Sequence, residues 1–530
     1  MKTSKRLRAV IAAAFFLAAV RLNAAGTVEQ WGVFELALNG PANGNPFLDA
    51  QFSARFTQGA EATEVKGFYD GDGVYRVRFM PERQGKWSYT TASATKELSG
   101  RSGGFSVSPP SANNHGPVHV TNTFHFAYAD GTPYKQLGTT CYVWTHQPEE
   151  LQEQTLKTLA ASPFNKLRMC VFPKRYTWNT NDPVLYPFAG TPLTKWDFTR
   201  FNPNFFQHFE QRVCDLQRLG IEADLILFHP YDGGHWGFDR MPADADDRYL
   251  HYVVARLAAY RNVWWSLANE YDFMKEKRES DFVRFGEIVS RDDPYHHPLS
   301  IHNGQTIFNH TLPWITHASI QNGAAVEEPG RAQMYRDVYR KPVVYDEVKY
   351  EGDIANRWGQ LSAEELVFRF WNGTVVGAYV GHGETYKSDD QILWWSKGGV
   401  LKGQSPARLA FLKQVLDDAP ARGIEPIDKW QNPEYGGQPS EYYLVYLGKQ
   451  TPTSWDFKLP KLPQGKGQPP AAGLKFTAEV LDTWNMTVTP VAGVFTLKKT
   501  DGYFHADKDG RSIPLPGKPY MAIRIKRVKE

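Results

Sequence analysis

Eight short apolar segments alternate with helix-forming stretches across residues 130–422, and this alternation constrains the fold more than any other feature. Each segment is apolar along its whole length, which is typical of a parallel strand buried on both faces. Eight such strands with intervening helices predict a (β/α)8 barrel. A doubly wound sheet is the alternative, but no G-x-G-x-x-G motif follows the first strand. The predicted strands are Gln136–Tyr142, Lys166–Phe172, Ala223–Phe228, Val263–Leu267, Leu299–His302, Ala318–Gln321, Val343–Asp346 and Gly377–Val380.

The segments on either side of the predicted barrel have the shorter rhythm of all-β domains. Residues 25–125 contain several short apolar runs and predict an immunoglobulin-like β-sandwich. Within them, Asp70-Gly71-Asp72-Gly73 favours a tight hairpin turn over a calcium loop, because no later acids follow at ligand spacing. Residues 425–530 predict a second, smaller β-sandwich. We therefore expect a multidomain α/β plus β protein whose central TIM barrel is flanked by two β domains.

The first 24 residues have the pattern of a secretory signal peptide. A basic start is followed by the apolar run Ala9–Val20 and by Ala24 at the cleavage position. The run is shorter than the roughly 20 apolar residues that span a membrane, and an uncleaved anchor is the alternative. Cleavage removes five basic residues and turns the formal net charge of +3 slightly negative. We expect a periplasmic or secreted protein with no membrane span after cleavage and no nucleic-acid partner, since such binders present a basic surface.

The three cysteines, Cys141, Cys170 and Cys214, form neither a disulfide framework nor a C-x-x-C pair. Cys141 and Cys170 lie in neighbouring predicted strands, where a bridge is one interpretation and buried free thiols are the favoured one. No histidines have the tight H-x-H or H-E-x-x-H spacing of catalytic metal sites. The sequence therefore predicts no metal and no cofactor.

Polar residues follow each predicted barrel strand, at the end where TIM barrels hold their active sites. Glu270 follows the fourth strand and Glu347 follows the seventh, so the two face each other across the pocket. Glycoside hydrolysis needs two carboxyl groups, one to protonate the leaving oxygen and one to attack the anomeric carbon or activate water. Asp346 adjoins Glu347, but neighbouring strand residues point to opposite sides, so we expect one of them in the pocket. Burial near a second carboxylate is expected to raise the pKa of the acid.

Other polar and aromatic residues near the strand ends are candidates for binding substrate. Arg168 interrupts an apolar strand, and we expect it to point into the pocket and pair with a carboxylate such as Glu347. Glu384 is interpreted either as a third pocket carboxylate or as a structural acceptor, and Asp232 and Glu351 as loop caps or sugar contacts. We expect four further residues to form hydrogen bonds with the sugar: His229, His302, Gln321 and His382. We expect three tryptophans to stack on its ring, with positions in the core as the alternative: Trp144, Trp236 and Trp395.

The Asn269-Glu270 pair after a strand resembles the signature of clan A, the retaining (β/α)8 glycoside hydrolases. Further stretches resemble a family of secreted bacterial proteins assigned as glycoside hydrolases, with an N-terminal immunoglobulin-like domain, an apiosidase-like barrel and a C-terminal β domain. The resemblance implies that Glu270 is the acid/base, that Glu347 is the nucleophile and that Asn269 binds the sugar 2-hydroxyl group. The matching stretches are residues 67–73 (GFYDGDG), 345–353 (YDEVKYEGD), 382–386 (HGETY), 394–399 (WWSKGG), 482–486 (DTWNM) and 515–521 (LPGKPYM).

The sequence thus predicts a secreted glycoside hydrolase that cleaves O-glycosidic bonds by retaining double displacement. The expected substrate is a plant or algal polysaccharide or its oligosaccharides. A non-catalytic carbohydrate-binding protein on a degenerate barrel is the alternative, and an inverting hydrolase is a second one. Neither a G-x-S-x-G elbow nor a phosphate-binding P-loop motif is present, which disfavours a serine esterase and a nucleotide hydrolase.

Overall fold

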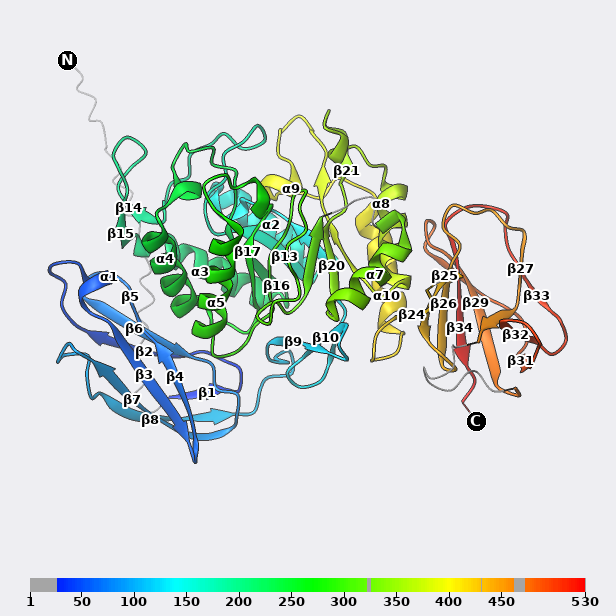
Figure 1. The fold of residues 1–530 in the computed structure, drawn as a ribbon, viewed down its shortest axis with the longest axis horizontal. Coiled ribbons are helices and arrows are strands. Elements are labelled where there is room, and N and C mark those ends of the chain that lie inside the picture. The colour runs from blue at the N-terminus through cyan, green and yellow to red at the C-terminus, as the bar shows by residue number, and fades with distance from the viewer. Residues whose placement is uncertain (1–25, 322–325, 430, 462–471, 530) are drawn as a thin grey trace, which may run out of the picture.

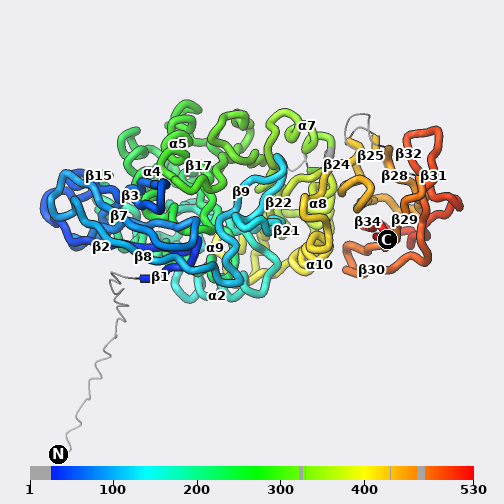
Figure 2. The backbone as a smooth tube through the Cα atoms, turned by 90° about the horizontal axis from the view of Figure 1, so that it is seen from below, coloured from blue at the N-terminus to red at the C-terminus, as the bar shows by residue number. Residues whose placement is uncertain are grey.

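Three domains lie in a row along the molecule, with the barrel between two β domains (Figures 1 and 2). The computed structural model describes residues 26–321, 326–429, 431–461 and 472–529. The predicted signal peptide, residues 1–24, lies outside the described residues. This arrangement agrees with the predicted order of a β domain, a barrel and a second β domain.

The central domain contains the predicted parallel barrel. Its strands follow the order β18-β17-β16-β13-β12-β22-β20-β19, and a parallel bridge between His302 and Ser319 joins the two ends of this order. Every neighbouring pair is parallel, because each strand is followed by a crossover that returns the chain to the same end. The strands are β12 (Gly138–Thr140), β13 (Lys166–Cys170), β16 (Glu222–Phe228), β17 (Val263–Ala268), β18 (Leu299–Ser300), β19 (Ala318–Gln321), β20 (Val343–Glu347) and β22 (Tyr379–His382).

Helices surround the barrel, and local sequence signals mark where they begin. Asn202 precedes α3, and its side chain accepts a hydrogen bond from the Asn204 N–H at 3.2 Å, with Pro203 at the first helical position. Ser362 caps α8 in the same way by accepting from the Glu365 N–H at 3.2 Å. The helices are α2 (Glu149–Ala160), α3 (Pro203–Arg218), α4 (Ala243–Leu257), α5 (Glu279–Asp292), α7 (Pro329–Tyr339), α8 (Ala363–Val375), α9 (Trp394–Lys397) and α10 (Ser405–Asp417).

A buried cluster of charged side chains lies among the barrel strands. Lys166 Nζ is 2.8 Å from Asp224 Oδ2 and 2.9 Å from Asp346 Oδ1. Arg168 joins the cluster, with Nη1 3.6 Å from Asp346 Oδ2. Two cations therefore face two carboxylates, which meets the requirement that charges buried in a protein be paired.

A small sheet closes the base of the barrel. The ring of Phe126 lies 5.0 Å from that of Trp264 in β17, and Val344 in β20 belongs to the same apolar cluster. In Figure 1, β9 and β10 lie below the barrel strands. Residues 118–125 were expected at the end of the N-terminal domain, but β9 pairs with β10, β10 pairs with β11, and this small sheet packs on the barrel. The strands are β9 (Val118–Thr121), β10 (His125–Tyr128) and β11 (Pro133–Tyr134).

The N-terminal domain consists of two sheets, ordered β1-β8-β7-β3-β4 and β2-β6-β5. Between them Phe56 stacks on Phe79 with ring centroids 4.2 Å apart. The predicted hairpin turn is present: the Asp70 N–H donates to the Val74 carbonyl at 2.8 Å, and Gly71 has a φ of +93°. The immunoglobulin-like topology stays a prediction. The elements are β1 (Thr27–Glu29), β2 (Phe34–Asn39), α1 (Pro46–Asp49), β3 (Phe52–Gln58), β4 (Glu61–Lys66), β5 (Phe68–Tyr69), β6 (Val74–Phe79), β7 (Gly85–Ser93) and β8 (Ser102–Ser108).

Buried ion pairs join the N-terminal domain to the barrel. Glu210 of α3 accepts from Arg78 of β6 at 3.0 Å and from Arg256 of α4 at 2.5 Å. Arg256 Nη2 also lies 2.8 Å from Asp70 Oδ1 at the hairpin turn. All four side chains are buried, so the ion pairs that join the N-terminal domain to the barrel lie inside the interface, where each charge has a partner.

The C-terminal domain docks against α8 and α10. The ring of Trp371 in α8 stacks on that of Tyr446 at 5.6 Å, and Arg524 donates to Asp418 at 3.0 Å. Its main sheet follows the order β24-β25-β26-β34-β29-β31-β32-β28, with β30 beside β29. The strands are β24 (Glu425–Asp428), β25 (Asn432–Gln438), β26 (Tyr442–Tyr446), β27 (Ser454–Asp456), β28 (Lys458–Pro460), β29 (Lys475–Asp482), β30 (Thr487–Pro490), β31 (Phe495–Lys498), β32 (Phe504–Asp507), β33 (Ser512–Pro514) and β34 (Met521–Arg527).

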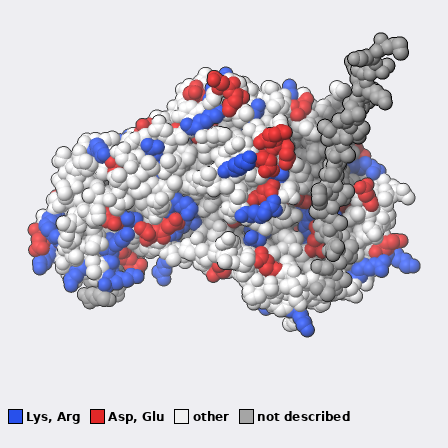
Figure 3. Space-filling model, turned by 180° about the vertical axis from the view of Figure 1, so that it is seen from behind, with Lys and Arg blue, Asp and Glu red and all other residues white. Residues whose placement is uncertain are grey.

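Charged side chains of both signs are interspersed on the face shown in Figure 3. Neither sign gathers into a continuous patch on that face, unlike the basic stripe of a protein that binds a polyanion along its surface. Among the helices of the described residues, none combines the length and the apolarity that crossing a membrane requires.

Candidate active site

A cavity of about 610 Å³ is lined by residues that end or follow the barrel strands, and both predicted catalytic glutamates line it. Glu270 lies two residues after the end of β17 and is 7 % exposed, and Glu347 is the last residue of β20 and is 9 % exposed. The lining residues are Tyr142, Lys174, Tyr176, Trp178, Tyr231, Asn269, Glu270, Gly304, Gln305, Gln321, Glu347, Lys349, Tyr350, Arg357, Trp358 and Trp395.

The backbone of Glu270 is in the left-handed region, with φ +50° and ψ +54°. This conformation costs roughly 1–2 kcal/mol for a residue with a Cβ atom, so the surrounding structure has to hold it. Two backbone hydrogen bonds flank it: the Tyr271 N–H donates to the His302 carbonyl at 3.1 Å, and the Phe273 N–H donates to the Glu270 carbonyl at 3.0 Å. The strained turn is what places the side chain over the barrel, where it lines the pocket.

The surroundings of Glu270 favour its protonated form. Burial raises the pKa of its carboxyl group to about 8, and the negative charge of Glu347 acts in the same direction. The positive charge of Lys174 and a hydrogen bond from Gln321 oppose this rise only in part. At neutral pH the group therefore holds a proton that it can donate.

Glu347 has partners that suit a charged carboxylate. The Tyr142 hydroxyl donates to Glu347 Oε1, and the same hydroxyl lies 3.2 Å from Asn269 Oδ1. His302 Nε2 lies 3.9 Å from Glu347 Oε1. Burial lowers the pKa of His302 to about 4, so its ring is neutral at pH 7 and does not bring a second charge to the site. The two glutamates therefore have different hydrogen-bond partners in one pocket.

Arg168 lies below the pocket and corrects one expectation. It pairs with Asp346 at 3.6 Å and Asp224 at 3.8 Å, not with Glu347, because Asp346 lies deeper in the barrel than the strand-end Glu347. Arg168 Nη2 also donates to Asn269 Oδ1 at 3.2 Å. Since the Asn269 oxygen accepts from Arg168, the amide NH2 group is left for a ligand.

Two further predicted residues lie at or directly under the site. Gln321 lines the pocket and its Oε1 is 3.1 Å from His302 Nε2. His302 in turn lies 2.9 Å from Ser319 Oγ. His302 thus sits beneath the lining and orients Gln321, which hydrogen-bonds to Glu270.

Trp395 belongs to an aromatic wall of the pocket. Its ring lies 4.8 Å from that of Trp358, 5.6 Å from Tyr142 and 5.7 Å from Tyr350. Such rings suit the apolar faces of a sugar. Trp358 and Trp395 were both expected as stacking platforms. Tyr142, Tyr231 and Lys174 were not singled out, although all three stand at or just after predicted strands, where the strand-end rule points.

Three predicted contact residues hold loops or the core. His229 Nε2 is 3.2 Å from the Phe172 carbonyl, and the Trp144 indole donates to the Met169 sulfur at 3.1 Å. Trp236 is buried and packs on Phe238. None of the three lines the pocket, because these other contacts hold each side chain.

His382 and Glu384 also lie outside the pocket lining, behind the barrel wall. His382 Nδ1 is 2.8 Å from Thr139 Oγ1, and its ring stacks on Phe164 at 4.6 Å. Glu384 accepts from the Gly403 N–H at 2.8 Å, which is the structural-acceptor interpretation. Asp232 caps its own loop by accepting from the Phe238 N–H at 2.8 Å.

One group of ligand-type side chains in the described residues is compact enough to hold a metal ion: Glu351, His382 and Glu384. The two carboxylates already accept backbone N–H groups before and at the start of α10, including Gln404 N–H to Glu351 at 2.8 Å. They anchor the chain there, and the group does not line the pocket with the two glutamates.

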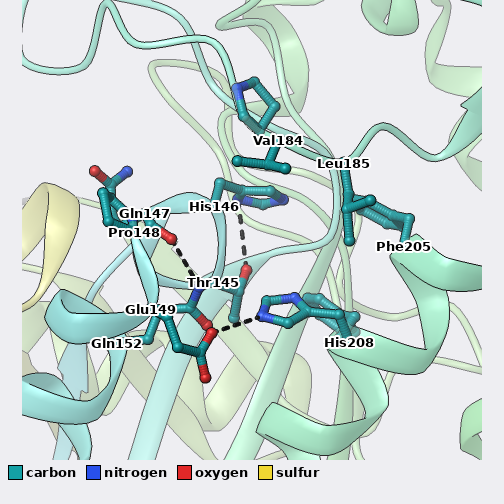
Figure 4. A pocket seen from close by; sticks show the side chains of 12 residues that line it. Thr145, His146, Gln147, Pro148, Glu149, Gln152, Val184, Leu185, Phe205 and His208 are labelled. Carbon is teal, nitrogen blue, oxygen red and sulfur yellow. Dashed lines mark hydrogen bonds and ion pairs between the residues drawn. The ribbon is translucent and has the colours of Figure 1, made fainter. Parts of the chain in front are cut away.

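A second cavity, of about 290 Å³, lies beside α2 and α3 (Figure 4). Its lining contains one carboxylate, Glu149, whose Oε2 is 3.6 Å from His208 Nε2. A single carboxylate cannot supply the two roles of glycoside hydrolysis.

The three cysteines are free, with Cys141 and Cys170 buried, so the favoured interpretation of free thiols is confirmed.

Comparison with known proteins agrees with this geometry. The family model described as "Apiosidase-like, catalytic domain" matches residues 121–431. The chain belongs to the apiosidase-like catalytic-domain family. Two domains of unknown function match the flanks of this family member, DUF5060 at residues 27–94 and DUF5605 at residues 430–526.

Solved structures of glycoside hydrolases are also similar to this chain. A candidate glycoside hydrolase from Bacteroides vulgatus is 43 % identical, with a TM-score of 0.91, and the match covers 95 % of this chain and 100 % of that one. A family 5 glycoside hydrolase from the same organism is 16 % identical with a TM-score of 0.57, covering 78 % and 93 %, and shows the shared fold. Functionally curated proteins gave no match. The barrel of this apiosidase-like protein is a glycoside hydrolase catalytic domain.

Proposed function

We propose that this apiosidase-like protein is a secreted glycoside hydrolase that cleaves O-glycosidic bonds of a poly- or oligosaccharide with retention of configuration. One observation carries the proposal: Glu270 and Glu347 line one pocket from opposite strands, and they have contrasting surroundings. A protonated acid beside a carboxylate that accepts a hydrogen bond is the arrangement that double displacement needs.

The proposed reaction has two steps. In the first, the Glu347 carboxylate attacks the anomeric carbon while Glu270 donates its proton to the departing glycosidic oxygen, leaving a glycosyl ester on Glu347. In the second, the Glu270 carboxylate takes a proton from water as the water oxygen attacks the same carbon and releases Glu347. After both steps Glu270 is protonated and Glu347 is free again, and water is the co-reactant that is consumed.

The neighbouring residues have positioning roles in this proposal. Tyr142 stabilises the charge on Glu347 through its hydroxyl, and the free amide of Asn269 binds the sugar 2-hydroxyl group. Trp395 provides a ring for stacking. We also propose that the substrate is a plant or algal polysaccharide or its oligosaccharides, which the panel below tests, and that the signal peptide is cleaved, which the N-terminal mass of the exported protein tests.

The experiment measures sugar released from a panel of polysaccharides and aryl glycosides by the wild type, Glu347→Ala and the exposed control Glu97→Ala. We expect release by the wild type and the control, and a loss of about a thousandfold or more for Glu347→Ala. A folded Glu347→Ala protein with full activity contradicts the assignment. Proton NMR of the first product decides between retention and inversion, and tight binding without release supports the carbohydrate-binding alternative.

A further inference from the structure

A buried lysine forms part of the pocket floor, and the proposed reaction does not use it. Lys174 follows β13 by four residues and lines the same cavity as Glu270 and Glu347. It is 2 % exposed. A fully buried ammonium group is costly unless something in the site pairs with it.

Aromatic rings surround the Lys174 ammonium group. Its Nζ lies 4.0 Å from the ring centroids of Tyr142 and Tyr231, 4.4 Å from Tyr176 and 5.2 Å from Trp395. These rings attract the positive charge and fix its position, but their faces accept no conventional hydrogen bond. The cage therefore holds the cation without using its three N–H donors.

Within the described part of the chain, the Lys174 ammonium group forms no hydrogen bond and no ion pair. The nearby carboxylates Glu270 and Glu347 influence it only through longer-range attraction. Its donors are thus available to a ligand that enters the pocket.

Two other residues of the pocket lining are also positively charged. Lys349 and Arg357 also line the cavity, and neither forms an ion pair or hydrogen bond with a described residue. The described lining therefore contains three cations against two carboxylates, even if both glutamates are charged. A neutral sugar has no group that balances this excess, whereas a carboxylate on the sugar does.

We propose that the substrate carries a uronic acid residue whose carboxylate binds the Lys174 ammonium group at or next to the bond that is cleaved. The proposal rests on the glycoside hydrolase function and adds the chemical class of the sugar. Lys349, half-buried, and Arg357, exposed, attract the same acidic chain at the pocket mouth.

Calorimetric titration of the intact protein tests this without turnover. The probes are glucuronate and galacturonate, each compared with its neutral hexose, glucose or galactose. We expect each bound uronate to bind about tenfold or more tightly than its hexose in the wild type, because a charge-assisted hydrogen bond is gained. Lys174→Met should abolish this difference between uronate and hexose, and the exposed control Lys96→Met should match the wild type.

The outcomes separate the two proposals. Equal binding of uronates and hexoses by the wild type overturns the uronate assignment, as does a Lys174→Met protein that still prefers uronates. Thermal unfolding shows whether Lys174→Met folds. If it does not, the test uses the comparison of uronate with hexose binding in the wild type and in Lys174→Arg, which keeps the charge and should keep the preference for uronates. If the protein prefers uronates but hydrolyses no glycoside, the uronate assignment stands and the proposed hydrolase function is wrong. If it hydrolyses only neutral glycosides, the hydrolase function stands and the uronate assignment is wrong.

Discussion

Arg168 Nη2 donates to the side-chain oxygen of Asn269 at 3.2 Å, and this contact connects the charged barrel interior to the floor of the active site. Arg168 is itself held by Asp346 and Asp224. The ion pairs thus determine where the guanidinium lies, and the guanidinium determines which way the Asn269 amide turns. We propose that Arg168 is a positioning residue that acts on the substrate through Asn269.

Arg168→Lys tests this relationship, because lysine keeps the positive charge but lacks the second donor arm of the guanidinium. We expect kcat to fall about tenfold to a hundredfold with a small change in thermal unfolding. A double-mutant cycle with Asn269→Ala should show a coupling of about 1 kcal/mol or more. Strictly additive effects of the two substitutions contradict a role through Asn269.

Tyr142→Phe removes the hydroxyl that donates to Glu347 and leaves the ring that faces Lys174. We expect kcat to fall by about a hundredfold, as when one donor to a developing or displaced charge is deleted. Tyr503→Phe, at an exposed tyrosine, is the matched control. Unchanged steady-state kinetics for the pocket variant would show that the hydroxyl is not needed.

The activity should fall at alkaline pH because Glu270 must be protonated to act as the acid. Burial and the charge of Glu347 raise the pKa of Glu270 to about 8, so kcat/KM should decline above that pH. In Glu270→Gln, assayed on an aryl glycoside whose leaving group needs no proton, this alkaline limb should disappear. Its persistence would assign the limb to another group.

Glu270 should also make the folded protein less stable at high pH. Its folded pKa of about 8 lies above the ordinary 4.5, so between these values the unfolded chain loses the proton and the folded chain keeps it. Stability present below pH 4.5 is therefore lost as the pH rises towards 8. Relative to Glu270→Gln, the wild type should lose roughly 4 kcal/mol of unfolding free energy across this range. Chemical denaturation at pH 5 and pH 8.5 measures it, and parallel pH profiles for the two proteins would contradict it.

Glu210 should be essential for docking the N-terminal domain. Glu210→Gln leaves Arg78 and Arg256 without their shared carboxylate in a buried interface. We expect a loss of about 3–5 kcal/mol and faster proteolysis between the domains, with Glu97→Gln as the exposed control. Limited proteolysis followed by mass spectrometry gives the rates, and equal cleavage of the two variants would show that the network is dispensable.

The two catalytic candidates could be located from the sequence, because a strand and the residue that follows it are neighbours in the chain. A polar residue directly after a buried strand must lie at the strand end, so Glu270 and Glu347 could be placed without coordinates. The same rule was too permissive for His229 and His382, which also follow or end strands. Their rings turn towards the Phe172 carbonyl and the Phe164 ring, and nothing in the linear sequence records that choice.

The barrel, the flanking β domains and the pair of strand-end glutamates could be predicted without coordinates, because apolar periodicity and strand ends are properties of neighbouring residues. The pairing of Arg168 with Asp346 and the cage of rings around Lys174 became visible only in the folded chain. These contacts join strands and loops far apart in the chain, and a buried charge takes its partner from whatever packing brings within reach. The chemistry of each side chain was readable in the sequence, but its partner depended on the fold.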